Sequence, residues 1–317
     1  MLKRLPLVSV CITAYNHGGY IIQCVQSVLD QKGDFEIEIL VGDDGSSDET
    51  RQILMSLSEC HPDRIKVFFH PQNLGASGNL CFLISRAEGQ FIAHLDGDDY
   101  WLADKLQRQL ILLAEHPDCV AVYGNGLVVN DEGKHFARFH SPLKAKKLYL
   151  TDIVERGNFL FHSSLLYRSA NKDVILSIPG GFIDFRMHIR LASIGPVLLI
   201  NQPVAVYRHA SSSSMIRHMP NLVFQYYWQA LQEAAQLGVS GPAHNAAGLF
   251  WERIFISSLR NLAFSNIMKW WRICGERQSV RLGVLRRTWL MVRSLRLVFI
   301  ALHARLQSPA QRVLYRR

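Results

Sequence analysis

The chain has 317 residues, of which 49% are hydrophobic and 19% are charged, so it is not a polar chain that lacks the means to build a core. Residues 1–215 hold 20 Lys and Arg against 23 Asp and Glu, a balance of −3, whereas residues 216–317 hold 15 against 3, a balance of +12. The two balances sum to the net charge of +9, and we therefore expect two regions, 1–215 and 216–317, with different partners.

The cysteines and the first residues argue against a secreted or membrane-spanning protein. None of the six cysteines forms a CxxC pair, and several lie in apolar runs, as expected of buried, reduced thiols in a cytoplasmic protein. Residues 1–16 lack the long apolar segment and cleavage site of a signal peptide and favour a first strand. No stretch reaches about 18 uninterrupted apolar residues, so we expect no transmembrane helix.

The first hundred residues alternate between strand and helix patterns. Strands are predicted at residues 7–13, 36–42, 65–69 and 91–95, and helices with apolar positions at helical spacing lie between them. Ser46 and Glu49 have the spacing of a capping box at the start of the second helix. This alternation predicts an α/β fold with a mostly parallel sheet.

The pattern becomes less regular after the fourth strand. The prediction there is a helix at 104–115, strands at 120–123 and 126–130 before a turn at 131–133, an irregular basic segment at 134–150, a strand at 159–168 and a helix at 185–194. Residues 216–317 contain many helix-forming residues and few turn signals, so we expect them to be mostly helical.

Three polar clusters follow three of the predicted strands, at residues 13–16, 43–46 and 96–99. Ligands of open α/β sheets bind at the carboxyl ends of the strands. We therefore expect these clusters, which are distant in sequence, to form one site at one edge of the sheet.

The third cluster has the composition of a site for a divalent cation. Asp96 and Asp98 are two positions apart, and Gly97 between them lets the backbone turn. Mg²⁺ and Mn²⁺ prefer carboxylate oxygens and share them with substrate phosphates. The alternative is an acidic turn that caps the following helix.

Several segments together are similar to a known family: 8–31, 38–50, 73–79, 89–109 and 182–195. In them the chain resembles a family 2 glycosyltransferase of the GT-A fold, over about residues 5–215. The resemblance implies a Rossmann-like, mostly parallel mixed sheet flanked by helices, followed here by a mainly helical region.

The resemblance implies a nucleotide pocket at the first two strand ends. Thr13, Ala14 and Tyr15 would line it. Asp44 would accept a hydrogen bond from the uracil N3–H, with Asp43 beside it.

The resemblance also implies how the diphosphate of a nucleotide-sugar donor is held. Asp98 would bind an Mn²⁺ or Mg²⁺ ion that bridges the diphosphate, and Asp96 would lie near both the ribose and the ion. Arg208 would contact the diphosphate, and His209 would add a contact to the metal or to a phosphate, although a polar loop end explains both equally well. Asp99 has no assigned role beyond bracing the turn.

The resemblance implies that Asp184 is the catalytic base. Family members often have Glu-Asp six residues before an arginine, and this chain has Ile183-Asp184 and then Arg190, so the Asp is kept and the Glu is not. The alternative is an ordinary aspartate at a helix N-terminus. His162 would lie near the acceptor or would be a hydrogen-bonded core histidine.

Residues 281–305 have the pattern of a basic amphipathic helix. Apolar residues and one threonine form its stripe, at positions 284, 285, 288, 291, 292, 295, 298, 299 and 302. Arg286, Arg293 and Arg296 fall on the other side. Such a helix suits an anionic membrane surface, or else it packs on its own domain or on a partner. We expect no nucleic-acid partner, because no matching fold motif is present.

The predicted function is a metal-dependent, inverting glycosyltransferase that moves a sugar from a UDP-sugar to a hydroxyl of a glycan or lipid-linked glycan. It would be cytoplasmic and peripheral on the inner face of the membrane. One alternative, a nucleotide-sugar-binding protein without transferase activity, is favoured by the missing Glu before Asp184. Another, a sugar nucleotidyltransferase, would need a basic glycine-rich loop, and residues 13–19 contain no Lys or Arg.

Overall fold

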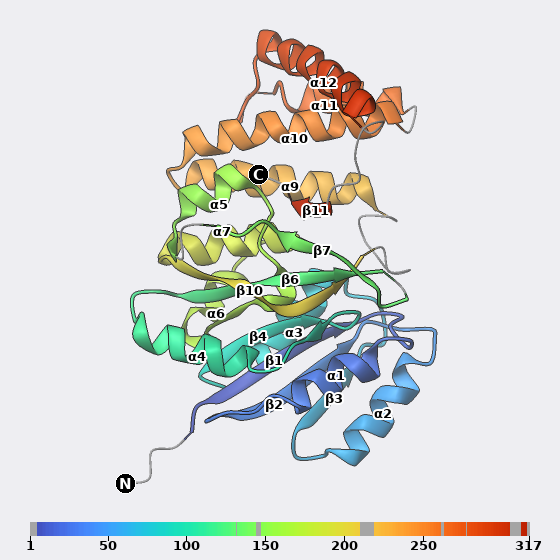
Figure 1. Ribbon diagram of the computed structural model, residues 1–317, viewed down its shortest axis with the longest axis vertical. Coiled ribbons are helices and arrows are strands. Elements are labelled where there is room, and N and C mark those ends of the chain that lie inside the picture. The colour runs from blue at the N-terminus through green and yellow to red at the C-terminus, as the bar shows by residue number, and fades with distance from the viewer. Residues whose placement is uncertain are drawn as a thin grey trace.

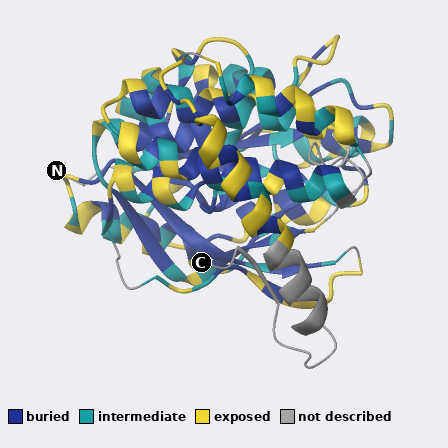
Figure 2. Cartoon of the chain, turned by 90° about the horizontal axis from the view of Figure 1, so that it is seen from above, coloured by how far each residue is buried: buried dark blue, intermediate teal, exposed yellow. Residues whose placement is uncertain are grey.

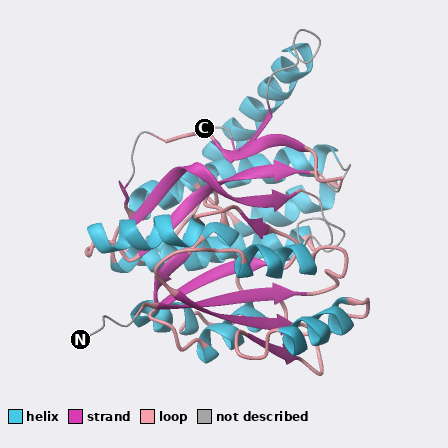
Figure 3. Cartoon of the chain, turned by 60° about the horizontal axis from the view of Figure 1, so that its bottom comes forward, coloured by secondary structure: helices cyan, strands magenta, loops and turns pink. Residues whose placement is uncertain are grey.

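The computed structural model describes residues 5–130, 132–143, 147–209, 219–260, 263–276, 278–304 and 312–315. Within them, an 11-stranded mixed sheet has helices on both faces, and further helices are stacked beyond one face (Figures 1 and 3). The predicted α/β class with a helical C-terminal region is confirmed.

The first half of the sheet is parallel, with β1 between β4 and β2 and with β3 outside β2. All four predicted strands are present: β1 (Leu7–Ala14), β2 (Glu36–Asp43), β3 (Ile65–Phe69) and β4 (Phe91–Asp96). The helices that connect them and follow them are α1 (Ile21–Leu29), α2 (Thr50–Cys60), α3 (Ala76–Arg86) and α4 (Lys105–Glu115).

The second half of the sheet is mixed, because β9 runs antiparallel to both β4 and β6, while β10 is parallel to β6. Its elements, with those near it, are β5 (Tyr100–Trp101), β6 (Ala121–Val129), β7 (His135–His140), β8 (Lys147–Leu148), α5 (Leu150–Arg156), η1 (His162–Ser164), β9 (Leu166–Arg168), η2 (Ser169–Asn171), α6 (Lys172–Leu176), α7 (Asp184–Ile194) and β10 (Val197–Arg208).

Three predictions in this half are wrong. The two strands predicted at 120–130 are one strand, β6, because Gly124 and Gly126 leave room for the side chains of Val204 and Phe161 that pack over them. The segment predicted as irregular contains β7 and β8, and β7 forms a hairpin with β6. The strand predicted at 159–168 is irregular up to residue 165 apart from the short 3-10 helix η1, and only its last three residues form β9.

The predicted capping box of α2 is also wrong. Glu49 is the N-cap residue, but its side chain makes no capping hydrogen bond. The Ser46 hydroxyl instead accepts a hydrogen bond from the backbone N–H of Asn16, in the loop after β1. The polar side chains at this helix start therefore connect two loops rather than capping one helix.

The core lies in two layers, one on each face of the sheet. Alternate side chains of β1 point into opposite layers. Val8, Val10 and Ile12 pack in the layer that contains α1, α2 and α4, and Cys11 packs in the layer that contains α3. The layer of Cys11 continues outward without a break through α7 and α9 to α10. The helical region thus shares a hydrophobic core with the sheet.

The C-terminal region is helical, as predicted. It comprises α9 (Pro220–Gln236), α10 (Ser240–Arg260), α11 (Phe264–Ile273), α12 (Val284–Ala304) and the short strand β11 (Arg312–Tyr315). The predicted amphipathic helix corresponds to α12, although the side chains of 296, 298, 299 and 302 lie outside the described residues. Within the described residues, every helix is too short or too polar to cross a bilayer. The boundary between regions 1–215 and 216–317 stays a prediction.

All six cysteines are free, and four of them are buried as expected. Cys60 is exposed and Cys81 is half-buried. The prediction of buried thiols is therefore wrong for Cys60, which lies at the end of α2.

Candidate functional site

The ends of three strands bring the predicted polar clusters together. In the sheet, Thr13 of β1 pairs with Asp96 of β4, and Ala14 pairs with Asp43 of β2. The Thr13 hydroxyl donates a 3.0 Å hydrogen bond to Asp96 Oδ1, and Asp44 N–H donates a 2.9 Å hydrogen bond to the Ala14 carbonyl. The predicted convergence at one edge of the sheet is therefore present.

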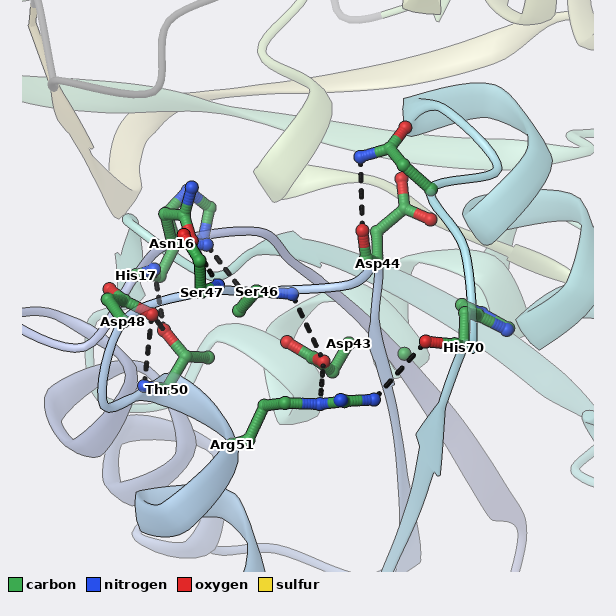
Figure 4. Close-up of polar contacts among 12 residues, drawn as sticks. Asn16, His17, Asp43, Asp44, Ser46, Ser47, Asp48, Thr50, Arg51 and His70 are labelled. Atoms are coloured by element: carbon green, nitrogen blue, oxygen red, sulfur yellow. Dashed lines mark hydrogen bonds and ion pairs between the residues drawn. The ribbon is translucent and has the colours of Figure 1, made fainter.

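The loop after β1 is fastened to the loop after β2 by side-chain to backbone hydrogen bonds (Figure 4). Asn16 has a positive φ of 55°, a conformation that asparagine tolerates better than most residues, and its Oδ1 accepts from Ser47 N–H at 2.8 Å. Asp48 accepts from the backbone N–H of Gly18 at 3.0 Å and of Thr50 at 3.1 Å. These bonds fix the backbone around Tyr15, whose side chain is exposed at the mouth of the site.

The two aspartates after β2 have different surroundings. Asp43 is fully buried and forms an ion pair with Arg51 of α2, with 2.8 Å between Oδ2 and Nε (Figure 4). Asp44 Oδ1 accepts a hydrogen bond from Leu74 N–H at 2.6 Å, which holds the loop before α3. Asp43 is therefore bonded to α2, whereas Asp44, which is only 3% exposed, is bonded to the loop before α3.

The acidic turn after β4 is organised by a serine of η1. The Ser163 hydroxyl lies 2.6 Å from Asp99 Oδ2 and 3.4 Å from Asp96 Oδ2, and it accepts from Asp96 N–H at 3.2 Å. Asp99 is buried, and burial together with the charges of Asp98 and Asp96 raises the pKa of its carboxyl well above the ordinary value. Asp96 and Asp98 are only half-buried, so they, rather than Asp99, are placed to meet a ligand.

Arg208, the last residue of β10, lies beside this turn. Its backbone N–H donates a 3.0 Å hydrogen bond to Asp99 Oδ1, and its guanidinium group donates to Gln23 Oε1 on α1. The guanidinium carbon lies 4.8 Å from the ring centroid of Tyr20 and 5.5 Å from that of Tyr100. Its Nε atom is buried and has no hydrogen-bond partner. The backbone of Arg208 is thus bonded to the acidic turn, while its guanidinium group keeps spare donor capacity beside two tyrosine rings.

His209 lies apart from that arrangement. It is exposed, and its ring centroid is 5.9 Å from that of Phe136 on β7. Among the residues that the structure describes, no three His, Cys, Asp or Glu side chains are grouped so as to hold a metal ion. A cation here would therefore take Asp96 and Asp98 as its protein ligands and complete its shell with oxygens of a substrate, which is the usual pattern for Mg²⁺.

Asp184 is the first residue of α7 and faces the same space. Its Oδ1 accepts hydrogen bonds from Asn158 Nδ2 at 2.7 Å and from Phe185 N–H at 2.9 Å. Burial is the main cause of a raised pKa for this carboxyl, and the charge of Asp96 adds to it, while His162 and the two hydrogen bonds act in the opposite direction. Asp184 and Asp96 are therefore close enough to interact electrostatically, although one comes from α7 and the other from β4.

Three histidines lie behind Asp184. The ring of the half-buried His162 is 5.0 Å from that of His94 and 6.0 Å from that of His188. Burial lowers the pKa of both His94 and His188 well below the ordinary value, so these two rings are neutral at physiological pH. His162 therefore packs against two neutral histidine rings and interacts electrostatically with Asp184, but its buried Nδ1 has no hydrogen-bond partner. Both interpretations offered by the sequence stay predictions.

Several residues of the site were not predicted. Ser163 connects Asp96 with Asp99, and Gln23 and Tyr20 hold Arg208. Each of these contacts joins residues that are more than 60 positions apart, so no local spacing in the sequence points to them.

The comparisons with known proteins concern the family and the fold. The model of the family described as glycosyl transferase family 2 matches residues 9–175. An uncharacterized protein of Mycobacterium tuberculosis is 28% identical over 203 residues, which are 63% of this chain and 58% of that protein. The chain thus spans less than two thirds of the length of this relative.

Two solved structures share the fold. S. aureus TarS residues 1–349 in complex with UDP-GlcNAc has a TM-score of 0.57 and 19% identity, covering 82% of this chain and 89% of that one. The mannosyltransferase PcManGT from Pyrobaculum calidifontis in complex with GDP-Man and Mn²⁺ has a TM-score of 0.52 and 18% identity, covering 96% and 88%. At these identities the likeness concerns the fold alone.

Proposed function

The chain belongs to glycosyl transferase family 2, and from this premise we propose that it transfers a sugar from a UDP-sugar to a hydroxyl of a glycan or lipid-linked glycan, with inversion at the anomeric carbon. The observation that carries the proposal is the convergence of Asp96, Asp98 and Arg208 at one edge of the sheet, with Asp184 within electrostatic range of Asp96.

The donor nucleotide would lie against the ends of β1 and β2. Thr13, Ala14 and Tyr15 would line its pocket, and the fixed loops on both sides support a rigid wall there. Asp44 would accept the uracil N3–H. TarS was solved with UDP-GlcNAc and PcManGT with GDP-Man, so the fold itself accommodates more than one base and more than one sugar.

The diphosphate would be held between opposite charges. Asp96 and Asp98 would hold Mn²⁺ or Mg²⁺, and their half-buried carboxylate oxygens suit a hard cation. When bound, the ion neutralises charge that grows on the leaving diphosphate. Arg208 would donate to the phosphate oxygens through its unpaired Nε. Because His209 is exposed and lies apart from the two carboxylates, we do not assign it a contact to the metal or to a phosphate.

Asp184 would act as the base. The acceptor hydroxyl gives its proton to this carboxylate while its oxygen bonds to C1 of the sugar and the bond from C1 to the diphosphate oxygen breaks. Burial and Asp96 raise the pKa of Asp184, which brings it nearer to the range in which a base is effective. One displacement from the face opposite the diphosphate inverts the anomeric centre.

A nucleotide-sugar-binding protein without transferase activity is the second candidate. The observation in its favour is Ile183, where family members often have a glutamate before the base. We also propose that the chain is cytoplasmic and associates peripherally with the inner face of the membrane, since residues 216–317 carry a balance of +12, from 15 basic and 3 acidic residues.

Asp184→Asn tests the transferase proposal. We expect turnover of the UDP-sugar in the presence of Mn²⁺ to fall by at least about 100-fold, the usual contribution of a general base, while UDP binding measured by calorimetry changes little. The wild-type rate should fall as the pH is lowered and Asp184 becomes protonated. Because burial raises the pKa of Asp184, this fall should occur at a higher pH than the pKa of about 3.9 of an exposed aspartate. Undiminished turnover by Asp184→Asn would refute the role of the base. UDP binding by the wild type without transfer to any acceptor would favour the second candidate.

A further inference from the structure

Helix α12 presents an apolar stripe to solvent. Leu285, Trp289 and Val292 are 87%, 59% and 62% exposed, and they recur at the spacing of one helix face. Figure 2, which looks down on the C-terminal helices, shows exposed positions on this outer layer. Within the described residues this apolar face is not covered, so its stripe does not pack on the rest of the chain there.

The opposite face of α12 packs on the protein. Arg287, Leu290 and Ser294 are buried, and the indole N–H of Trp251 on α10 donates a 3.2 Å hydrogen bond to the Arg287 carbonyl. A polar contact and apolar packing therefore fix the orientation of α12. Because this face is held against the protein, the opposite face with Leu285, Trp289 and Val292 is turned to solvent.

Arg287 is a buried cation without a buried anion. It is 6% exposed, its guanidinium carbon lies 4.3 Å from the ring centroid of Trp271 on α11, and it donates to the Trp271 carbonyl. Its Nε atom has no hydrogen-bond partner, and no ion pair joins it to a carboxylate within the described part of the chain. Burial lowers its pKa, and the charge of Arg281 acts in the same direction. A buried charge of this kind is costly unless an anion accompanies it.

Arg287 opens into a groove between α11 and α12 with a volume of about 390 Å³. The groove is lined by Met268, Trp271, Arg272, Gly275, Glu276 and Arg287. It therefore contains two guanidinium groups against one carboxylate, and that carboxylate accepts a hydrogen bond from Gln278 at 3.4 Å. A groove of this size can take a phosphate group together with part of the molecule that carries it.

We propose that this groove binds the phosphate of an anionic membrane lipid, through Arg287 and Arg272, while the exposed stripe of α12 enters the membrane interface. Arginine matches phosphate geometry with paired N–H donors, and a basic region next to an exposed apolar helix face is the arrangement of surface-bound amphipathic helices. The inference rests on the peripheral placement proposed above and adds a defined site for the lipid phosphate.

The first test is sedimentation of the full chain with phosphatidylcholine vesicles that contain or lack phosphatidylglycerol. We expect binding only to the vesicles with phosphatidylglycerol. Arg287→Gln should weaken it by about tenfold or more, because it removes charge-assisted hydrogen bonds. The matched control Arg286→Gln changes an exposed neighbour that donates to Asn245, and it should weaken binding by no more than about fivefold, the effect of one surface charge. Equal losses would mean general charge attraction and would overturn the phosphate site.

Two further variants separate binding from folding. Arg287→Lys keeps the charge without the planar donor group and should recover only part of the affinity. Trp289→Ser leaves Arg287 in place and should also weaken vesicle binding by about tenfold, whereas Met55→Ser, which alters an equally exposed apolar side chain on α2, should have no effect. Far-ultraviolet circular dichroism and Tm establish that each variant is folded. Binding that is unchanged in Arg287→Lys, Arg287→Gln and Trp289→Ser would overturn the proposal.

Other occupants give different results. If wild type does not bind vesicles but inorganic phosphate raises its Tm and fails to raise that of Arg287→Gln, the groove takes a soluble phosphate and the lipid is excluded. If wild type does not bind vesicles and sedimentation velocity shows a dimer that Trp289→Ser dissociates, the stripe is covered by a second copy. Hydrolysis of a UDP-sugar, measured without vesicles, should be unchanged in Arg287→Gln. A failure of the proposed lipid site can therefore be told apart from a failure of the proposed transfer reaction.

Discussion

The three aspartates of the turn after β4 differ in what surrounds them, and this difference separates their roles. Asp99 is buried, and its carboxylate accepts hydrogen bonds from the Ser163 hydroxyl and from the backbone N–H of Arg208. Asp96 and Asp98 are half-buried. Burial, followed by the charges of Asp98 and Asp96, raises the pKa of Asp99 and so disfavours a third charge in this turn. The turn therefore combines two half-buried carboxylates with a buried one that braces it.

We expect Asp98→Asn and Asp99→Asn to have different effects. Asp98→Asn removes a charged oxygen ligand and should weaken Mn²⁺-dependent UDP binding, measured by calorimetry, by about tenfold or more. An asparagine at 99 can keep the bond from the Arg208 N–H through its Oδ1 and can donate from its Nδ2 to the Ser163 hydroxyl, so Asp99→Asn should change that affinity little.

A third variant serves as control for the brace. Asp99→Ala leaves the Ser163 hydroxyl and the Arg208 N–H without their partner, and it should lower the free energy of unfolding in urea by about 1–3 kcal/mol. Similar losses of UDP affinity in Asp98→Asn and Asp99→Asn would mean that Asp99 is also a metal ligand.

The sequence pointed to the candidate site residues more directly than to the residues that hold them in place. Asp96, Asp98, Asp184 and Arg208 fall in motifs with a recognisable composition, so they could be selected before the fold was known. Ser163 could not, since it is an ordinary serine whose partners lie 64 and 67 positions away. Contacts of that kind depend on tertiary packing, which leaves no local pattern.

At the scale of elements, the parallel strands were predictable and the second half of the sheet was not. β1 to β4 are short apolar runs between clear turn signals, which is the expected pattern of buried parallel strands. β6 contains two glycines, which in a sequence indicate an interruption, but here they accept neighbouring side chains into a continuous strand. Predicting this would have required knowing that Val204 and Phe161 pack over them.

Asp48, rather than the predicted pair Ser46 and Glu49, stabilises the start of α2. Partial burial raises the pKa of Asp48, but hydrogen bonds from the Thr50 hydroxyl and from the backbone N–H groups of Gly18 and Thr50 outweigh burial and lower it. Because the folded pKa lies below the unfolded value of about 3.9, this stabilisation is present above that value and is lost as the pH falls through the folded pKa.

Asp48→Ala should therefore destabilise the chain by about 1 kcal/mol at neutral pH, by analogy with the loss of a helix-capping side chain, and should have less effect in acid. Urea unfolding at a series of pH values measures both quantities. Glu49→Ala is the control and should be nearly neutral, since the Glu49 side chain makes no capping bond. A larger loss in Glu49→Ala than in Asp48→Ala would restore the predicted capping box.

At the scale of the whole molecule, the helical region is joined to the helix that carries Asp184. Helix α9 packs on α7, and the two share one hydrophobic layer with α10. The charge asymmetry between residues 1–215 and 216–317 suggested two regions, but charge describes the surface and gives no information about the core that they share. The polar link between them is Glu233 of α9, which forms ion pairs with Arg186 and Arg190 of α7.

Glu233→Gln should destabilise the whole chain and not only its C-terminal part. Glu233 is 7% exposed and Arg186 is 9% exposed, so removing the carboxylate leaves a buried cation without its partner, which typically costs about 3–5 kcal/mol. Because α7 begins at Asp184, we also expect transfer activity to decline together with the fraction folded in urea. The control is Asp118→Asn, which breaks an exposed pair with Lys147 and should destabilise the chain far less, because solvent screens that pair. If Glu233→Gln cost no more than this control, α7 and α9 would be held together by apolar packing alone, and the ion pairs would contribute nothing to the union of the two regions.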